Sequence, residues 1–159
     1  MEQDEKYMRI ALKEAQKAYE ENEVPIGAVI VKANEVIAKA HNKKEKKQQA
    51  IAHAEMLAIE KACKKLGTWH LEECTLYVTI EPCAMCAGAI MLSRIDRVVY
   101  GAKDPKGGCI DSCIQMYEQQ GFNHYPMHTS GVLEMECSNI MSTFFKERRI
   151  ENKQKKQAS

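Results

Sequence analysis

The spacing of apolar residues alternates along the chain between two periods, and this alternation limits the fold more than any other feature. Segments 4–21 and 53–66 carry apolar residues three and four apart, which predicts amphipathic helices. Residues 26–31 and 75–80 are instead short, almost continuous apolar runs, as is typical of buried strands. Helices that alternate with such strands predict an α/β sandwich.

Further periodic segments complete this pattern. A turn at Ala33-Asn34 separates the run over 26–31 from an extended run through 36–37, which predicts an antiparallel hairpin. Gly67 is placed to end the helix over 53–66. The remaining predicted elements are helices over 82–94, 109–120 and 133–149, and strands over 97–102 and within 124–131. A helical crossover between those last two strands favours parallel pairing.

Length, charge and cysteine content restrict the class of protein. A chain of 159 residues with 45% apolar composition suits one core, so we expect one domain over 1–150 and a polar, frayed tail over 151–159. The net charge of +1 predicts no overall attraction to nucleic acid or membrane. No apolar run approaches the ~20 residues of a membrane span. Seven cysteines, an odd number, without a recognisable signal peptide indicate reduced thiols in the cytoplasm.

The segment EPCAMC follows the predicted strand over 75–80 and opens a predicted helix. Pro82 suits the first helical turn, so Cys83 and Cys86 fall three apart on one helical face. Both thiols can therefore reach one metal ion. The helix N-terminus and a cation would each favour the thiolate form, which is the form that coordinates zinc.

Three kinds of site compete for this cysteine pair. A redox pair normally lies in a thioredoxin-like setting, which this order of elements does not reproduce. A structural zinc site would recruit Cys109 and Cys113 as its other half. A catalytic zinc site would use three protein ligands and keep one open position, and His53 is then the natural third ligand.

The segment IAHAEMLAIE places His53 and Glu55 two residues apart in a predicted helix. Residues at that spacing point to different sides of a regular helix, so both can face one site only from the helix start. We therefore predict that the helix begins at or just before His53, with Glu55 beside the metal but not bound to it. Zinc lowers the pKa of a bound water to about 7, and a nearby carboxylate can accept and redeliver the proton.

These residues resemble a known signature. His53-Ala54-Glu55 and Pro82-Cys83-Ala84-Met85-Cys86 are similar to the H-x-E and P-C-x-x-C motifs of zinc-dependent nucleobase deaminases. Further segments resemble bacterial tRNA-specific adenosine deaminases over almost the whole chain: VPIGAVIV, AHN, GAIMLSRIDRVVYGAKDPKGG, FNH and FFKERR. One difference is Gln49-Ala50-Ile51, where that family often has an acidic-Pro-Thr segment. The resemblance implies the cytidine deaminase-like fold, a three-layer α-β-α sandwich with a central mixed five-stranded sheet.

The resemblance also implies an activity and partners. His53, Cys83 and Cys86 would bind one zinc per subunit, and Glu55 would move protons during hydrolysis of adenosine to inosine at wobble position 34 of the tRNA anticodon. The enzyme would be a homodimer acting on the anticodon stem-loop, with an arginine tRNA as the expected substrate. The family implies these substrate contacts: Pro25, Ile26, Val29, Asn42, Ala54, Asp104, Lys106, Phe144, Phe145 and Arg148.

Two alternative functions share this zinc motif. One is a guanine or other free nucleobase or nucleoside deaminase, against which the basic, aromatic helix over 133–149 argues. The other is a noncatalytic, zinc-stabilised RNA-binding subunit, against which the presence of Glu55 argues. Phe144 lies on the apolar stripe of its helix, so Phe145 is better placed to stack on RNA. The lysines of segment 43–47 suit either a phosphate contact or an ordinary solvated surface.

Overall fold

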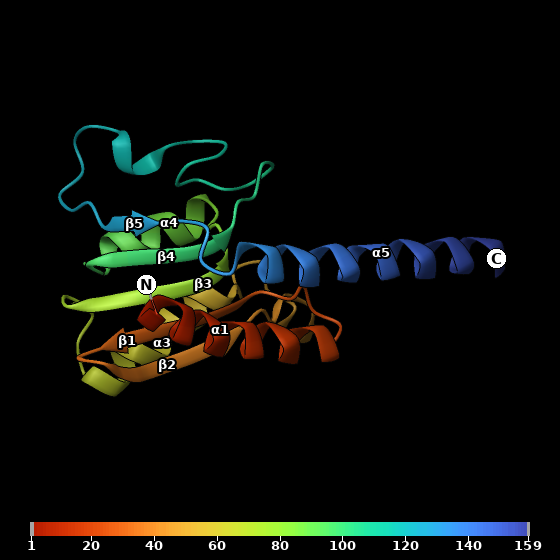
Figure 1. Ribbon diagram of the computed structural model, residues 1–159, viewed down its shortest axis with the longest axis horizontal. Helices are drawn as coiled ribbons and strands as arrows, with labels where there is room; N and C mark the ends of the chain where they lie inside the picture. Colours follow the sequence, from red (N-terminus) through yellow and green to blue (C-terminus); the bar gives the residue numbers. More distant parts are fainter. Residues whose placement is uncertain (1, 159) are drawn as a thin grey trace.

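The strands of the chain form one mixed sheet in the computed structural model, which describes residues 2–158. The sheet has the order β2-β1-β3-β4-β5 (Figure 1). The strands are β1 (Gly27–Lys32), β2 (Glu35–His41), β3 (Cys74–Ile80), β4 (Arg97–Ala102) and β5 (Met127–Thr129). β1 pairs antiparallel with both β2 and β3, whereas β3, β4 and β5 run parallel. The predicted mixed sheet, its hairpin and the parallel last strand are confirmed.

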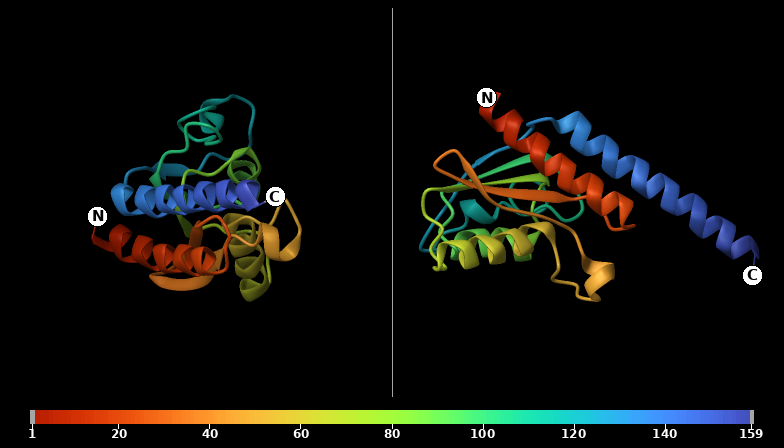
Figure 2. Two further views of the ribbon diagram at one scale, coloured as in Figure 1. Left: turned by 90° about the vertical axis from the view of Figure 1, so that its right-hand side faces the viewer. Right: turned by 90° about the horizontal axis from the view of Figure 1, so that it is seen from below.

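Helices cover both faces of this sheet, so the predicted three-layer α-β-α sandwich is confirmed. The helices are α1 (Glu2–Glu20), α2 (Lys44–Lys47), α3 (Ala54–Leu66), α4 (Ala84–Leu92) and α5 (Glu134–Ala158). α1 and α5 lie on one face, and α3 and α4 lie on the other (Figure 2). Within residues 2–158, none of the helices has both the length and the apolar character that crossing a membrane requires.

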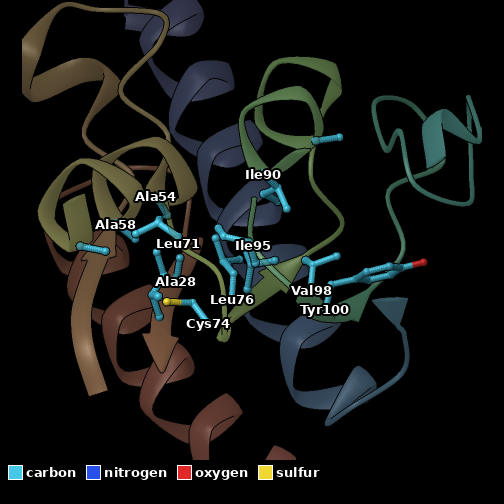
Figure 3. Close-up of a cluster of buried hydrophobic side chains, with 14 of the residues drawn as sticks. Ala28, Ala54, Ala58, Leu71, Cys74, Leu76, Ile90, Ile95, Val98 and Tyr100 are labelled. Carbon is cyan, nitrogen blue, oxygen red and sulfur yellow. The ribbon is translucent and has the colours of Figure 1, made fainter. Parts of the chain in front are cut away.

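The core between the sheet and α3 is built on small side chains. Ala54, Ala58 and Ala62 are fully buried against strand residues such as Ala28 and Leu76 (Figure 3). The larger apolar side chains, whose spacing predicted this helix with one apolar side, are only half-buried: Met56, Ile59, Cys63 and Leu66. Because alanine adds only a methyl group, the backbone of α3 can lie close to the sheet, and the larger residues are left at the margin.

Helix boundaries decide how the motif residues are presented. His53 is the N-cap of α3, as predicted, and Gly67 ends this helix in the left-handed conformation with φ of 70°. The helix predicted from Pro82 instead begins at Ala84, with Cys83 as its extended N-cap. The prediction was wrong by two residues because Pro82 still belongs to the extended connection that leaves β3.

Two predicted segments differ from the structure. Residues 109–120 form turns and the short 3-10 helix η1 (Met116–Glu118) rather than an α-helix. Here the Glu81 carboxylate accepts the backbone N–H bonds of residues 110–112. The later N–H groups, which an α-helix would bond four residues back, go elsewhere: Cys113 donates to the Gly108 carbonyl and Met116 to the Cys109 carbonyl. The tail predicted to fray from residue 151 continues α5 to Ala158, because its lysine, glutamine and glutamate residues favour helix. Met1 and Ser159, the ends of the predicted domain and tail, lie outside the described residues.

Candidate metal and active site

Three side chains with the donor atoms that zinc prefers meet at the N-termini of α3 and α4. His53 Nδ1 lies 3.7 Å from Cys83 Sγ and 3.7 Å from Cys86 Sγ, and the ligand atoms of all three residues lie within 4.8 Å of one another. Zinc bonds of the usual lengths at tetrahedral angles would separate a nitrogen and a sulfur ligand by about 3.6 Å. The observed separations therefore fit one zinc ion held by three protein ligands.

The fold brings these ligands together through two helix starts. Asn42, which follows β2, accepts a hydrogen bond from the Ala54 backbone N–H with its side-chain oxygen, and so fixes the beginning of α3. Cys83 caps α4, and Cys86 lies one turn later on the same helix. The Cys86 thiol, together with His53, lowers the pKa of Cys83 to about 3, although burial opposes this shift. Cys83 is therefore ready to act as a thiolate ligand.

Glu55 lies in the first turn of α3 and is not one of the three clustered ligands. Its side chain is 3% exposed, and its Oε1 atom has no hydrogen-bond partner within residues 2–158. Burial raises the pKa of this carboxyl group to about 7. A buried acceptor normally has a donor, so the orphaned oxygen fits a water molecule at an open zinc position. His53 therefore lies in the group that could hold the metal and Glu55 lies outside it, and the separate roles of the two residues stay a prediction.

The alternative four-cysteine site is not supported. Among residues 2–158, the group of His53, Cys83 and Cys86 is the only set of three or more such side chains close enough to share an ion. Cys109 instead donates its S–H to the Gly107 carbonyl, and Cys113 donates to the Pro105 carbonyl. Both thiols therefore belong to the loop after β4 rather than to the metal site.

Several predicted substrate contacts line one groove. Ile26, Asp104, Lys106 and Phe145 surround a cavity of about 680 Å³ between the entrance to β1, the end of β4 and α5. Arg149 lines the same groove and was not among the predicted contacts. Its place on the open side of α5 depends on the rotation of that helix, which the apolar stripe alone did not resolve.

Other predicted contacts lie elsewhere. Val29 is completely buried in the core shared with α1, on the sheet face opposite α3 and α4, so its predicted place in the pocket wall does not agree with the structure. Strand alternation explains the difference, because its neighbours Ala28 and Ile30 face α3. Pro25 and Ala54 are both buried.

The two phenylalanines of α5 differ in burial, as their positions on the helix predicted. Phe144 is 4% exposed and packs edge-on against Tyr19 of α1, whereas Phe145 is 39% exposed. Arg148 lies over the Phe144 ring, 4.9 Å from its centroid, and donates to the backbone carbonyl of Asn22. In this structure Arg148 therefore joins α5 to the segment after α1.

A charged residue that the sequence interpretation left without a role is Glu81. It is buried directly after β3 and accepts hydrogen bonds from the backbone of the loop that carries Asp104. The signal available in the sequence was a glutamate at the end of a continuous apolar strand, next to Pro82-Cys83. Buried carboxylates are rare unless they are paired, so a buried glutamate at this position is expected to have hydrogen-bond donors or a positive charge beside it.

Comparison with known proteins assigns the family. The model of the MafB19-like deaminase family matches residues 2–149. A tRNA-specific adenosine deaminase of Bacillus subtilis is 58% identical over 153 residues, covering 96% of this chain and 95% of the relative. A solved tRNA:A34 deaminase structure superimposes with a TM-score of 0.82 at 46% identity, covering 84% of this chain and 97% of its own. A guanine deaminase from Bacillus subtilis gives a TM-score of 0.60 at 40% identity, covering 62% of this chain and 64% of its own. Given this metal site and these relatives, the chain belongs to the bacterial tRNA-specific adenosine deaminases.

Proposed function

We propose that this protein hydrolyses adenosine to inosine and ammonia at wobble position 34 of a tRNA anticodon, with one zinc ion per subunit. The observation that carries this proposal is the buried Glu55 carboxylate, whose Oε1 atom has no hydrogen-bond partner within residues 2–158, next to a group of three side chains that could hold zinc. A fully enclosed structural zinc site would need no such carboxylate. The tRNA deaminase relative spans almost the whole chain, which supports the RNA substrate.

Each site residue has a distinct part in this reaction. Zinc bound to His53, Cys83 and Cys86 would supply Lewis-acid activation of a water molecule. Glu55 would accept the proton that the water loses as its oxygen attacks C6 of adenine, and would deliver that proton to N1. Glu55 would then transfer the remaining hydroxyl proton to the amino group, which leaves as ammonia. A carboxyl pKa of about 7 suits both acceptance and donation near neutral pH.

The groove beside α5 is the proposed RNA contact. Lys106 offers a positive charge to phosphate, and the half-exposed ring of Phe145 offers a face on which an unpaired base can stack. Asp104 would contact the nucleotides beside the target. Asn42 bonds to the Ile26 carbonyl and to the Ala54 N–H, and together with Pro25, Ile26 and Ala54 it would contact the target nucleoside. An arginine tRNA remains the expected substrate, and the cytoplasm the expected location, from the family resemblance.

An exposed apolar surface supports a homodimer. Leu92 at the end of α4 is 73% exposed, and Phe122 is also exposed, although both are large apolar residues. Met91, Leu92, Phe122 and His124 line a largely apolar cavity of about 360 Å³. Apolar surface of this kind is typical of protein interfaces. A second copy of this chain would remove it from water.

Free guanine is the second candidate substrate, because a guanine deaminase shares the fold at 40% identity. The zinc-loaded protein should be incubated with an anticodon stem-loop that carries adenosine at position 34 and, separately, with guanine. We expect inosine in the RNA. Turnover of guanine alone would show that the substrate assignment is wrong, and RNA binding without turnover of either substrate would indicate a noncatalytic subunit.

A matched variant tests the role of Glu55. Glu55→Gln keeps the size of the side chain but removes its ability to carry the proton, so kcat should fall by about a hundredfold or more. Zinc content should remain one per subunit, because Glu55 is not a ligand. Deamination at the wild-type rate by this variant would disprove the proposed proton transfer.

A further inference from the structure

The Glu81 carboxylate organises the loop of residues 104–112, here named the carboxylate-bound loop. Its Oε1 atom accepts hydrogen bonds from the Asp104 backbone N–H at 3.1 Å and from the Ser112 hydroxyl. Its Oε2 atom accepts the backbone N–H bonds of Ile110, Asp111 and Ser112 at 3.1, 2.8 and 2.9 Å. Both oxygens therefore face donors, as a negatively charged acceptor requires.

Burial would favour the neutral form of this carboxyl group, but the hydrogen bonds outweigh burial. Its two oxygens accept four backbone N–H bonds and one hydroxyl bond, which is the environment of a carboxylate rather than of a protonated acid. A buried charge held in this way is sensitive to the loss of its partners, because it cannot regain contact with water without opening the loop.

Glu81 lies between the segment that carries the metal ligand Cys83 and the carboxylate-bound loop. Glu81 follows β3 directly and precedes the zinc ligand Cys83 by two residues, and its own N–H donates to the Ala102 carbonyl at the end of β4. The backbone N–H of Cys109 donates to the Pro82 carbonyl. The carboxylate-bound loop is therefore joined to the segment that presents Cys83.

The same loop carries two of the groove residues. The Asp104 carboxylate accepts the backbone N–H bonds of Lys106 and Gly107, which folds this part of the loop into a tight turn. Asp104 and Lys106 both line the groove beside α5. Their positions depend on the hydrogen bond from the Asp104 N–H to Glu81, because no strand or helix holds residues 103–112.

We propose that Glu81 is a positioning residue, which holds Asp104 and Lys106 in place for RNA binding while leaving the zinc ligands and Glu55 to carry out the chemistry. This inference rests on the proposed function. Asp104 and Lys106 would hold RNA beside the target base rather than the reacting atoms, and loss of binding that is equal in the ground and transition states raises KM while kcat stays unchanged. The effect of Glu81 should therefore appear in KM for the stem-loop more than in kcat.

Two substitutions disturb the same carboxylate from opposite sides. Glu81→Gln keeps the shape of the side chain, but either orientation of the amide turns its NH2 group toward backbone N–H donors: that of Asp104, or those of Ile110, Asp111 and Ser112. Gly108→Ala leaves Glu81 unchanged but would place a methyl group 2.3 Å from its carboxyl carbon, so the carboxylate must move. Asp4→Asn is the control, because Asp4 binds Arg97 at the opposite end of β4.

Steady-state kinetics of the zinc-loaded protein on the anticodon stem-loop provide the test. Glu81→Gln and Gly108→Ala should each raise KM by about ten- to a hundredfold, with kcat changed by less than about threefold. Zinc content should stay at the wild-type level in both variants and in Asp4→Asn, whose KM should also be unchanged. In an Asp104→Ala background, Glu81→Gln should raise KM much less than in the wild type, because both changes remove the same contact.

Other outcomes would overturn the proposal. Loss of zinc, a fall in kcat equal to the change in kcat/KM, additivity with Asp104→Ala, or unchanged KM would each show that Glu81 does not act through the loop. Amide hydrogen exchange gives a second measurement that does not need RNA turnover. Glu81→Gln should speed exchange of residues 104–112 and leave α3 protected. Failure of the wild type to deaminate RNA would contradict the proposed function, and unchanged exchange would independently contradict the role of Glu81 in ordering the loop.

Discussion

Replacement of Ala58 by leucine tests the close packing of α3 on the sheet and its consequence for the metal site. Ala58 is fully buried in the cluster that includes Ala28 and Leu76 (Figure 3). Leucine adds three carbon atoms at this contact. If a void were present, burying them would stabilise the fold by about 0.8 kcal/mol each, or roughly 2 kcal/mol in total. Because the contact is filled, we expect destabilisation by about 1–3 kcal/mol instead.

The same strain should reach the zinc ligands through the rigid helix. His53 caps α3, and its Nδ1 atom lies 3.7 Å from each cysteine sulfur. A movement of α3 by about 1 Å away from the sheet would stretch a zinc–nitrogen distance from about 2 Å toward 3 Å, which is too long for a bond. Ala58→Leu should therefore weaken zinc binding as well as lower the free energy of unfolding.

Urea denaturation and zinc titration with a competing chelator measure these two effects. Lys64→Leu is the matched control, since Lys64 is exposed on the same helix, and its free energy of unfolding should change by no more than about 0.5 kcal/mol. A more stable Ala58→Leu protein would refute the reasoning, because the sign of the change separates a filled contact from a void. Loss of stability with unchanged zinc affinity would refute the transmission of strain through α3.

Three further predictions concern stability. Leu76→Ala in the central strand β3 should lower the free energy of unfolding by about 2–5 kcal/mol in urea, because this side chain is fully buried, and a loss below about 1 kcal/mol would contradict its place in the core. The hydrogen bonds from Arg97 lower the pKa of Asp4 below 3.8, so the stability that Asp4 contributes is complete above that pH and disappears as the pH falls through the lowered pKa. Asp4→Asn should accordingly be less stable than the wild type near neutral pH and equal to it in strong acid, and a constant difference across that range would contradict this assignment. Chelation of zinc should lower the thermal unfolding midpoint of the wild type, because zinc bound to the folded state stabilises it. The midpoint of Cys86→Ser should not change, because this variant lacks a buried ligand that zinc binding requires.

Local patterns were enough to predict most of the elements and the three side chains that meet at the candidate metal site. Apolar runs predicted the strands β1 to β4, a fifth strand was expected within 124–131, and the motif spacing placed His53 at the start of α3. Such features depend on residues close in sequence: capping, strand alternation and ligand type. Predictions that needed the rotation or depth of an element were less accurate, as the buried position of Val29 and the alanine face of α3 show.

Residues 109–120 show where local information ends. Their apolar spacing fits a helix, yet in the structure the N–H groups of residues 110–112 bond to Glu81, about thirty residues earlier in the chain. A helix that begins at residue 109 leaves these first N–H groups without a partner of its own, so Glu81 can bind them, and the later bonds from Cys113 to Gly108 and from Met116 to Cys109 replace the helical pattern. The amino-acid sequence alone determined which side chains can bind zinc and move protons, because that depends on their chemistry and local spacing. Only the tertiary structure decided which acceptor the N–H groups of residues 110–112 use, because that depends on where the end of β3 places the Glu81 carboxylate.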